Sequence, residues 1–377
     1  MNDYKICSRC VMDTSDAKIK FDKDGVCDHC LAFDKNILPI WNFGKGREKQ
    51  LKEIVDKIKQ SSKGKDFDCI LGMSGGIDSS YLLYLVTKKL DLRPLVFHVD
   101  AGWNSQIAVN NIEKLVDGLG LDLYTEVIDW EEMKDLQRSF FKSGVPHVDT
   151  PQDHAFFATM YKFAANYNIK NIITGGNFST ECTRNPKDWM YYQSDSTQLK
   201  DIHNKFGQKP LKNFPLTSAV WHRLYLPFMR GIKLHRILDY MEYNKEEATK
   251  FLVNNYGYQE YPQKHFESRF TRFYESYWLP ERFGFDTRRV QFSSLILTNQ
   301  MSRDEAIEIL KQPSYDKENI KHEFEYISSK LDMSVDELKD CMNMPLRTYK
   351  DFKSQDYIYK IGATVSRILS LEAGGKR

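Results

Sequence analysis

The residues with the clearest chemical potential form one short stretch, Ser74-Gly75-Gly76-Ile77-Asp78-Ser79. The apolar run before it predicts a buried strand, and the apolar residues after it predict a helix. The two glycines let the backbone turn sharply and come close to a ligand. A strand, turn and helix of this kind point unpaired backbone N–H groups at one place, which suits an anion. We therefore interpret the stretch as a pyrophosphate cradle in which Ser74 and Ser79 donate hydroxyls and Asp78 binds magnesium.

Four of the seven cysteines fall into two pairs near the N-terminus. Cys7 and Cys10 form one C-x-x-C knuckle, and Cys27 and Cys30 form the second. Two such knuckles can complete the tetrahedral thiolate shell of zinc, and four protein ligands leave no open position for catalysis. We predict a structural zinc ribbon over residues 1–34. A redox pair, an iron–sulfur cluster and a partner-docking ribbon are the alternatives.

The elements that must position these residues alternate between strand and helix from about residue 67 to 175. Expected strands are 67–71, 95–99, 121–128 and 171–174, and expected helices are 78–90, 105–118, 131–142 and 152–167. This alternation predicts the α/β fold class, with a doubly wound parallel sheet. Ligands of such sheets bind beyond the carboxyl ends of the strands. Two further strand ends, Val99-Asp100 and Gly175-Gly176-Asn177, carry polar or glycine-rich sequence, and we expect them to converge on the glycine loop.

The remaining regions flank this α/β core. Residues 35–66 predict a connector with an amphipathic helix, 67–230 the α/β domain, and 231–377 a mostly helical region for a substrate or partner. The formal net charge of the 377 residues is only +2, unlike the basic field of a dedicated nucleic-acid binder. No apolar run approaches the roughly 20 residues that span a bilayer, and the N-terminus lacks an apolar signal region. The expected location is the cytoplasm.

The segment 261–274 concentrates cationic and aromatic side chains in the helical region. On a helix, His265, Arg269 and Arg272 would share one face. One interpretation is an exposed helix with salt bridges. The other is a cationic wall that faces a phosphate or an acidic sugar, because arginine binds oxyanions through two parallel hydrogen bonds. We name Lys264, Arg269 and Arg272 as candidate contacts for such a group.

The glycine loop contains neither the Walker A pattern nor G-x-G-x-x-G. Its Ser-Gly-Gly-Ile-Asp-Ser sequence instead resembles the PP-loop of the N-type ATP pyrophosphatases, which include GMP synthetase, NAD synthetase, asparagine synthetase and the tRNA thiolases. In that superfamily the loop holds the leaving pyrophosphate while a substrate oxygen attacks the α-phosphorus. The resemblance therefore implies an adenylated intermediate.

Further motifs follow in an order that narrows the resemblance. They are the first cysteine pair, Thr-Gly-Gly-Asn at 174–177, the segment 264–274, Leu279-Pro280, Phe283-Gly284, Arg288-Arg289 and residues 300–306. Together they resemble the N-acetyl sugar amidotransferases of bacterial surface-polysaccharide, lipopolysaccharide and nonulosonic-acid biosynthesis, over nearly the whole chain. The resemblance implies that ATP activates the oxygen of a sugar acetamido group and that ammonia then replaces it. The product would be an acetamidino sugar, with AMP and pyrophosphate.

The resemblance also implies roles for individual residues. Ser74, Gly75, Gly76, Asp78 and Ser79 would contact pyrophosphate and magnesium. The strand end at Asp100 would border adenine and ribose, while Gly175, Gly176 and Asn177 would approach the α-phosphate, with Glu181 as a nearby carboxylate. Asp78, Lys264, Arg269 and Arg272 are the predicted catalytic residues, and the predicted cofactors are ATP, Mg²⁺ and Zn²⁺. No residue stands out as a general base.

Glutamine hydrolysis requires a cysteine nucleophile, and the chain offers no suitable one. Position 2 is Asn2, and Cys69, Cys182 and Cys341 lack the flanking glycines of a nucleophile elbow. We expect ammonia to come from a separate glutaminase subunit that resembles the amidotransferase subunit of imidazole glycerol phosphate synthase, with or without a cyclase-like companion.

Two alternatives remain at this stage. A PP-loop enzyme that thiolates tRNA could use Cys182 as a sulfur carrier, although the near-neutral net charge opposes it. A nucleotide-binding scaffold without catalysis would leave Asp78 and the cationic segment without a purpose. The first interpretation requires an acetamido sugar and no nucleic acid or membrane.

Overall fold

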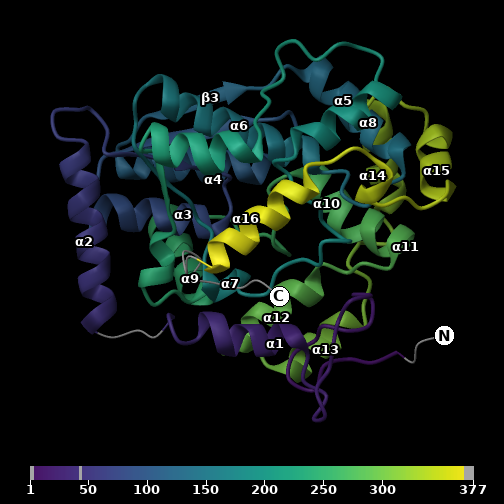
Figure 1. The fold of residues 1–377 in the computed structure, drawn as a ribbon, viewed down its shortest axis with the longest axis horizontal. Coiled ribbons are helices and arrows are strands. Elements are labelled where there is room, and N and C mark those ends of the chain that lie inside the picture. The colour runs from purple at the N-terminus through teal and green to yellow at the C-terminus, as the bar shows by residue number, and fades with distance from the viewer. Residues whose placement is uncertain (1–3, 42–44, 369–377) are drawn as a thin grey trace.

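The centre of the molecule is a parallel sheet surrounded by helices (Figure 1). The computed structural model describes residues 4–41 and 45–368. Its five strands are β1 (Cys69–Gly72), β2 (Pro94–Asp100), β3 (Leu123–Val127), β4 (Asn171–Ile173) and β5 (Lys233–His235), in the order β3-β2-β1-β4-β5. Leu71 in β1 pairs with Val96 on one side and Ile173 on the other. The predicted parallel α/β fold is confirmed.

The strand β5 was not expected from the sequence. Its three residues pair in parallel with β4 and extend the sheet beyond the predicted end of the α/β domain at residue 230. The predicted boundary therefore divides the sheet and is wrong by at least these residues. Two polar residues in a three-residue edge strand give no apolar run by which the strand could be recognised.

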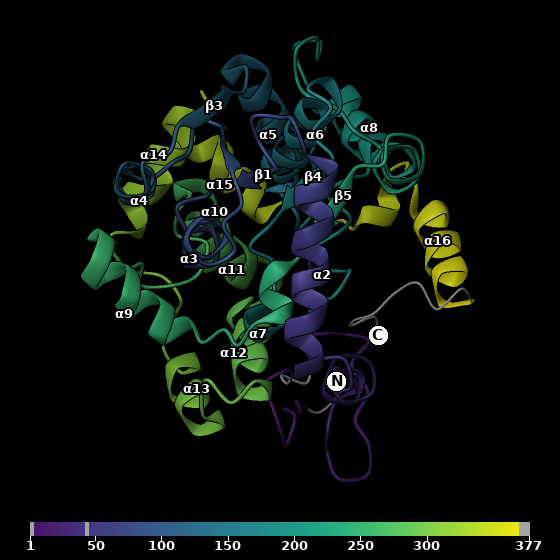
Figure 2. The same cartoon turned by 90° about the vertical axis from the view of Figure 1, so that its left-hand side faces the viewer.

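Side chains that alternate along the strands build two apolar cores on opposite faces of the sheet. Ile70 and Phe97 join one cluster, whereas Leu71 and Val96 join the other. The first cluster includes α5 (Trp130–Ser143) and α6 (Thr150–Asn166), and the second includes α3 (Ile77–Tyr84), α4 (Gln106–Leu119) and α9 (Lys245–Tyr256). Figure 2 shows α3, α4 and α9 on one side of the molecule and α16 (Asp356–Ile368) on the other. Helices on both faces are the doubly wound arrangement.

The predicted helices of the α/β region all occur, with ends set by local caps. The Ser105 hydroxyl caps α4, and Gly120 ends it with the left-handed backbone that favours glycine. The other elements are α1 (Asp28–Ala32), α2 (Lys45–Ser61), α7 (Phe178–Glu181), α8 (Ser196–Phe206), α10 (Arg269–Phe273), α11 (Leu279–Phe283), α12 (Arg288–Leu297), α13 (Arg303–Leu310), α14 (Ile320–Lys330), α15 (Val335–Asn343) and the short or widened turns η1 (Phe33–Ile37), η2 (Leu85–Lys89), η3 (Trp221–Met229), η4 (Ile237–Tyr240), η5 (Tyr274–Trp278) and η6 (Tyr349–Asp351).

The N-terminal cysteine segment packs against helices from the other end of the chain (Figure 1). The Arg303 guanidinium in α13 donates to the carbonyl oxygens of Cys7 and Cys10, at 2.8–3.2 Å. Arg289 in α12 donates to the Val11 carbonyl oxygen at 2.9 Å. The cysteine segment is therefore hydrogen-bonded to both α12 and α13.

The C-terminal helices share the first apolar core with the sheet. The Trp278 ring contacts Phe141 of α5 with a centroid separation of 4.6 Å, and Phe270 contacts Trp103 at 5.0 Å. Two backbone bonds join the same regions: the Ser105 N–H donates to the Glu267 carbonyl, and the Arg269 N–H donates to the Trp103 carbonyl. The segment after residue 266 therefore packs against the loop that follows β2 and against α5.

In the described part of the chain, no helix combines the length and the apolar character needed to cross a membrane.

Candidate active site

A cavity of about 680 Å³ lies at the carboxyl ends of β1, β2 and β4. The loop of residues 74–79, called the PP-loop below, lines it through Ser74, Gly76, Asp78 and Ser79. Gly175 and Gly176 line it from the loop after β4. The structure thus brings the glycine loop and the end of β4 together, as expected for ligand sites in parallel sheets.

The PP-loop leaves backbone donors free for a ligand. Gly75 has a φ of +84°, and a Cβ at this position would lie 2.8 Å from the Ala108 carbonyl oxygen, so only glycine fits. The helix α3 begins at Ile77 without a side chain that caps its first N–H groups. Within the loop, the Gly76 N–H donates to the Ser74 hydroxyl at 3.2 Å. An anion at this helix end would find N–H donors and the positive end of the helix dipole.

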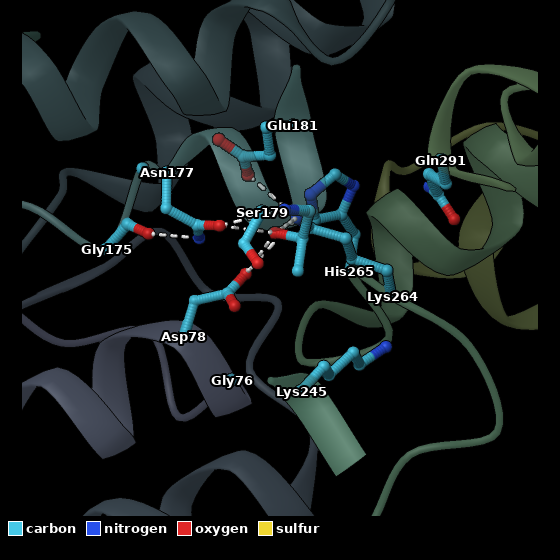
Figure 3. Close-up of polar contacts among 12 residues, drawn as sticks. Gly76, Asp78, Gly175, Asn177, Ser179, Glu181, Lys245, Lys264, His265 and Gln291 are labelled. Atoms are coloured by element: carbon cyan, nitrogen blue, oxygen red, sulfur yellow. Dashed lines mark hydrogen bonds and ion pairs between the residues drawn. The ribbon is translucent and has the colours of Figure 1, made fainter. Parts of the chain in front are cut away.

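Lys264 lies between two carboxylates at this end of the cavity (Figure 3). Its Nζ atom is 3.2 Å from Asp78 Oδ2 and 2.8 Å from Glu181 Oε1. The Tyr243 hydroxyl donates to Asp78 Oδ1 at 2.6 Å. Burial alone would raise the pKa of Asp78, but the Lys264 charge and the Tyr243 hydrogen bond outweigh it and lower the pKa. Asp78 is therefore ionised at neutral pH, as a cation ligand must be.

Two predicted catalytic arginines lie elsewhere. Arg269 and Arg272 both pair with Glu323 of α14, at 3.0 and 2.7 Å, and neither lines the cavity. The predicted helix face is also wrong, because α10 begins only at Arg269, after the capping residue Ser268. His265 has a φ of +67°, outside any helix. The salt-bridged helix is thus the interpretation that the structure supports for these arginines.

Two residues predicted to contact ATP instead shape loops. Asp100 does not line the cavity, and its Oδ1 atom accepts a hydrogen bond from the Gly102 N–H at 2.7 Å. Asn177 is fully buried. Its Oδ1 atom accepts from the Thr180 N–H, which caps α7, and its amide donates to the Gly175 carbonyl at 2.9 Å. Asn177 therefore holds the glycines of this loop in place without reaching the cavity.

Beside the PP-loop the cavity has an apolar slot that sequence patterns did not indicate. Its lining is Gly72, Met73, Phe97, His98, Val99, Phe156, Phe157 and Met160. His98 contacts the Met73 carbonyl oxygen through Nδ1 and the Asn104 amide through Nε2, so its imidazole ring is held in one orientation. An apolar slot next to an anion site suits the adenine base of a nucleotide.

Acidic side chains line the cavity where α6 and η5 meet. Asp149 immediately precedes α6 as its N-cap residue, Asp153 lies in the first turn of α6, and Glu275 lies in η5. Burial raises the pKa of Asp149 well above its ordinary value and that of Asp153 to about 6. Burial would lower the pKa of His265, but the Glu275 carboxylate, 3.0 Å from its Nδ1 atom, raises it to about 9. No motif pointed to this cluster, and two aspartates on a helix N-terminus are common as dipole partners alone.

The four N-terminal cysteines form a cluster suited to a metal. Their sulfur atoms all lie within 4.8 Å of one another, and the four side chains are fully buried. Sγ–Sγ separations include 3.8 Å between Cys7 and Cys30 and 3.6 Å between Cys10 and Cys27. Zn–S bonds of about 2.3 Å in a tetrahedron require sulfur atoms about 3.8 Å apart, so the cluster matches the predicted four-thiolate metal site.

The fold and the loop define the class of protein: a PP-loop domain on a doubly wound parallel sheet, with a four-cysteine ribbon. Residues 267–366 match a family model described as "LPS biosynthesis protein WbpG-like, C-terminal domain". Residues 267–366 are thus similar to the C-terminal domain of a lipopolysaccharide-biosynthesis family, in line with the resemblance that the sequence motifs indicated.

Solved structures with similarity to the chain include two small synthetases. One is an NH3-dependent NAD synthetase from Campylobacter jejuni subsp. jejuni NCTC 11168 in complex with the nitrate ion, at 15% identity and a TM-score of 0.29, covering 58% of this chain and 98% of that one. The other is an NMN synthetase from Francisella tularensis, at 13% identity and a TM-score of 0.29, covering 60% of this chain and 100% of that one. A search of curated proteins gave no match.

Proposed function

We propose that this protein converts the N-acetyl group of a sugar into an acetamidino group, with ATP and ammonia as co-substrates. One observation carries the proposal: the PP-loop and the WbpG-like segment line the same cavity. Ser74 and Asp78 lie on its nucleotide side, and Ser268, Thr271 and Glu275 line it from the segment that matches the lipopolysaccharide family. A substrate selected by that segment would thus meet the phosphates of a bound nucleotide.

The residues present fit ATP and magnesium. The free N–H groups of the PP-loop and α3 suit the leaving pyrophosphate, and the apolar slot suits adenine. Asp78 and Glu181 would hold Mg²⁺, which prefers carboxylate oxygens and would neutralise phosphate charge. Lys264 already lies between these two carboxylates, and its ammonium would balance the charge of the phosphates.

The chemistry requires activation because an amide oxygen is a poor leaving group. Attack of the acetamido oxygen on the α-phosphorus would form a C–O–P linkage and release pyrophosphate. The nitrogen lone pair of ammonia would then form a C–N bond at the imidate carbon. The C–O bond would break, and its electron pair would leave with AMP. Cationic and N–H groups around the phosphates stabilise the charge that develops in the first step.

The source of ammonia is the second part of the proposal. No cysteine lines the cavity in the described part of the chain, so glutamine has no nucleophile there. We therefore propose a separate glutaminase subunit, with ammonium salts as its substitute in vitro. The same observation opposes tRNA thiolation, because Cys182 is buried against Ser294 and burial raises its pKa to about 11.

The test is a mass-spectrometric screen of acetamido sugars, nucleotide-linked and free, with ATP, Mg²⁺ and ammonium. The expected product has one oxygen replaced by NH, with AMP and pyrophosphate formed in equal amounts. Lys264→Met should abolish product formation, whereas the matched change Lys339→Met on an exposed side chain should not. The proposal fails if no sugar gains the NH group while tRNA stimulates AMP release.

A further inference from the structure

The cavity contains an acidic chamber, defined here by Asp149, Asp153, Glu275 and Tyr274. Asp149 Oδ2 accepts from the Thr271 hydroxyl at 2.7 Å, and Asp153 Oδ2 accepts from the Gln193 amide at 2.7 Å. These bonds fix the orientation of both carboxylates, and both side chains line the cavity. The chamber is thus a built arrangement of acceptors on two rigid elements, α6 and η5.

Tyr274 is the independent sign that the chamber receives a ligand. Its side chain is only 1% exposed and lines the cavity, yet its hydroxyl has no hydrogen-bond partner among the described residues. Burial raises the pKa of Tyr274 well above its ordinary value, and the charges of Asp149, Glu275 and Asp153 add to this effect. Tyr274 thus lines the same cavity as the three carboxylates. A buried hydroxyl without a partner is costly unless a bound group supplies one.

Acidic groups outnumber basic groups around the chamber. Among the described residues, the charged partners of the three carboxyl groups are one another and His265, which pairs with Glu275. Lys264 is held by Asp78 and Glu181. A surplus of buried carboxylate attracts a cation and repels an anionic group. This part of the cavity therefore does not suit an acidic sugar, which is the kind of group that the predicted cationic wall would have bound.

We infer that the acidic chamber is an ammonium site, where Asp153 removes a proton from ammonium and so leaves ammonia as the nucleophile. The inference rests on the proposed function and deepens it. Ammonium has four N–H donors, and the chamber presents the three carboxylates and the Tyr274 hydroxyl as four acceptors. In neutral water most ammonia is protonated and carries no lone pair, so an enzyme that uses it needs both a cation site and a base.

Proton transfer from ammonium to the chamber precedes the attack on the imidate carbon. The N–H bond of ammonium breaks, its electron pair stays on nitrogen, and the proton passes to a chamber carboxylate. That lone pair forms the C–N bond at the imidate carbon, and the electron pair of the broken C–O bond leaves with AMP. Burial raises the pKa of Asp153 to about 6, which makes it a better base than an ordinary aspartate at neutral pH.

The first experiment measures binding without any sugar. Thermal unfolding of the full chain is compared in ammonium chloride, potassium chloride and sodium chloride at equal ionic strength, because a ligand of the native state raises the melting temperature. We expect ammonium to stabilise the wild type more than the other two ions. Asp153→Asn and Tyr274→Phe should lose this difference, while Tyr277→Phe, on the same helix but outside the cavity lining, should keep it. Equal shifts with all three ions would overturn the inference.

The second experiment separates the ammonium site from the proposed function. Exchange of labelled pyrophosphate into ATP in the presence of the sugar reports adenylation, and it needs no ammonia. Asp153→Asn should keep this exchange and raise the KM for ammonium about tenfold, the effect of one lost charge-assisted hydrogen bond. An unchanged KM for ammonium would overturn the inference. Absence of exchange with every sugar would refute the proposed function, and the unfolding experiment would still decide the ammonium site.

Discussion

The Oε1 atom of Glu267 lies 1.9 Å from the point where a Cβ atom on Gly76 would stand. Gly76 immediately precedes α3, and Glu267 is the first residue of the segment that matches the WbpG-like family. Burial raises the pKa of Glu267. The family-specific segment thus begins with a side chain that rests on the PP-loop and occupies the space that glycine leaves free.

Gly76→Ala is expected to impair the enzyme through this contact alone. The φ of Gly76 is −77°, which alanine adopts freely, so the damage comes from displacement of the Glu267 carboxylate. We expect a loss of about 1–3 kcal/mol in the free energy of unfolding, typical of overpacking. In the double variant Gly76→Ala, Glu267→Ala the clash is gone, so denaturant unfolding should show strong non-additivity. Simple addition of the two effects would contradict the close contact.

Lys264 and Arg272 should differ sharply when each is replaced by methionine. Lys264→Met leaves Asp78 and Glu181 without their shared cation, and we expect AMP formation to fall about 100-fold or more, as for the loss of a charge-stabilising donor. Arg272→Met removes a partly exposed pair with Glu323, worth about 0.2–1 kcal/mol of stability. Its AMP formation should stay near wild type. Equal losses of AMP formation would show that the arginine acts in catalysis after all.

The cysteine cluster should contain one zinc ion per chain, measured by elemental analysis of the purified protein. Cys10→Ser or prolonged chelation should remove it and lower the melting temperature, because a structural zinc site contributes folding free energy. Arg303→Met should keep the zinc yet weaken the docking of the ribbon on α13, since it removes the bonds to the Cys7 and Cys10 carbonyls. Iron with visible charge-transfer absorption would instead indicate an iron–sulfur cluster.

The His265–Glu275 pair should stabilise the fold in a defined pH range. The pKa of His265 is raised from 6.5 to about 9 in the folded protein. A raised folded pKa gives stability that is complete below pH 6.5 and is lost as the pH rises through about 9. The difference in melting temperature between wild type and His265→Gln should therefore shrink over that interval. His322→Gln, on an exposed side chain, serves as the control, and a difference that does not vary with pH would contradict the pairing.

The sheet was predictable because its central strands are buried on both faces. β1 and β2 appear in the sequence as apolar runs that end in turn residues, and the helix α4 that follows β2 has a clear cap at each end. The edge strand β5 was missed because only Leu234 in it is apolar. Local patterns thus located the sheet, but they could not detect a short strand stabilised by its pairing with β4.

The site was predictable only where local sequence creates it. The PP-loop follows from its glycines and the helix after it. The partner of Arg269 lies 54 positions away in α14, and no spacing rule indicates such a pair. The left-handed backbone at His265 keeps this residue out of the helix, which begins only at Arg269, and no residue type in the segment indicates this late start. The acidic chamber combines Asp149 with Glu275, which are far apart in the sequence and come together only where the folded chain lines one cavity.

The shared core around Trp103 limits how substrate preference could be transferred between relatives. Residues 267–366 form a family segment by sequence, but Phe270 and Trp278 bury their rings against Trp103 and Phe141 of the α/β region. A chimaera joined at residue 266 would place foreign aromatic rings on this surface. An exchange of specificity by recombination therefore has to include the loop after β2 and helix α5.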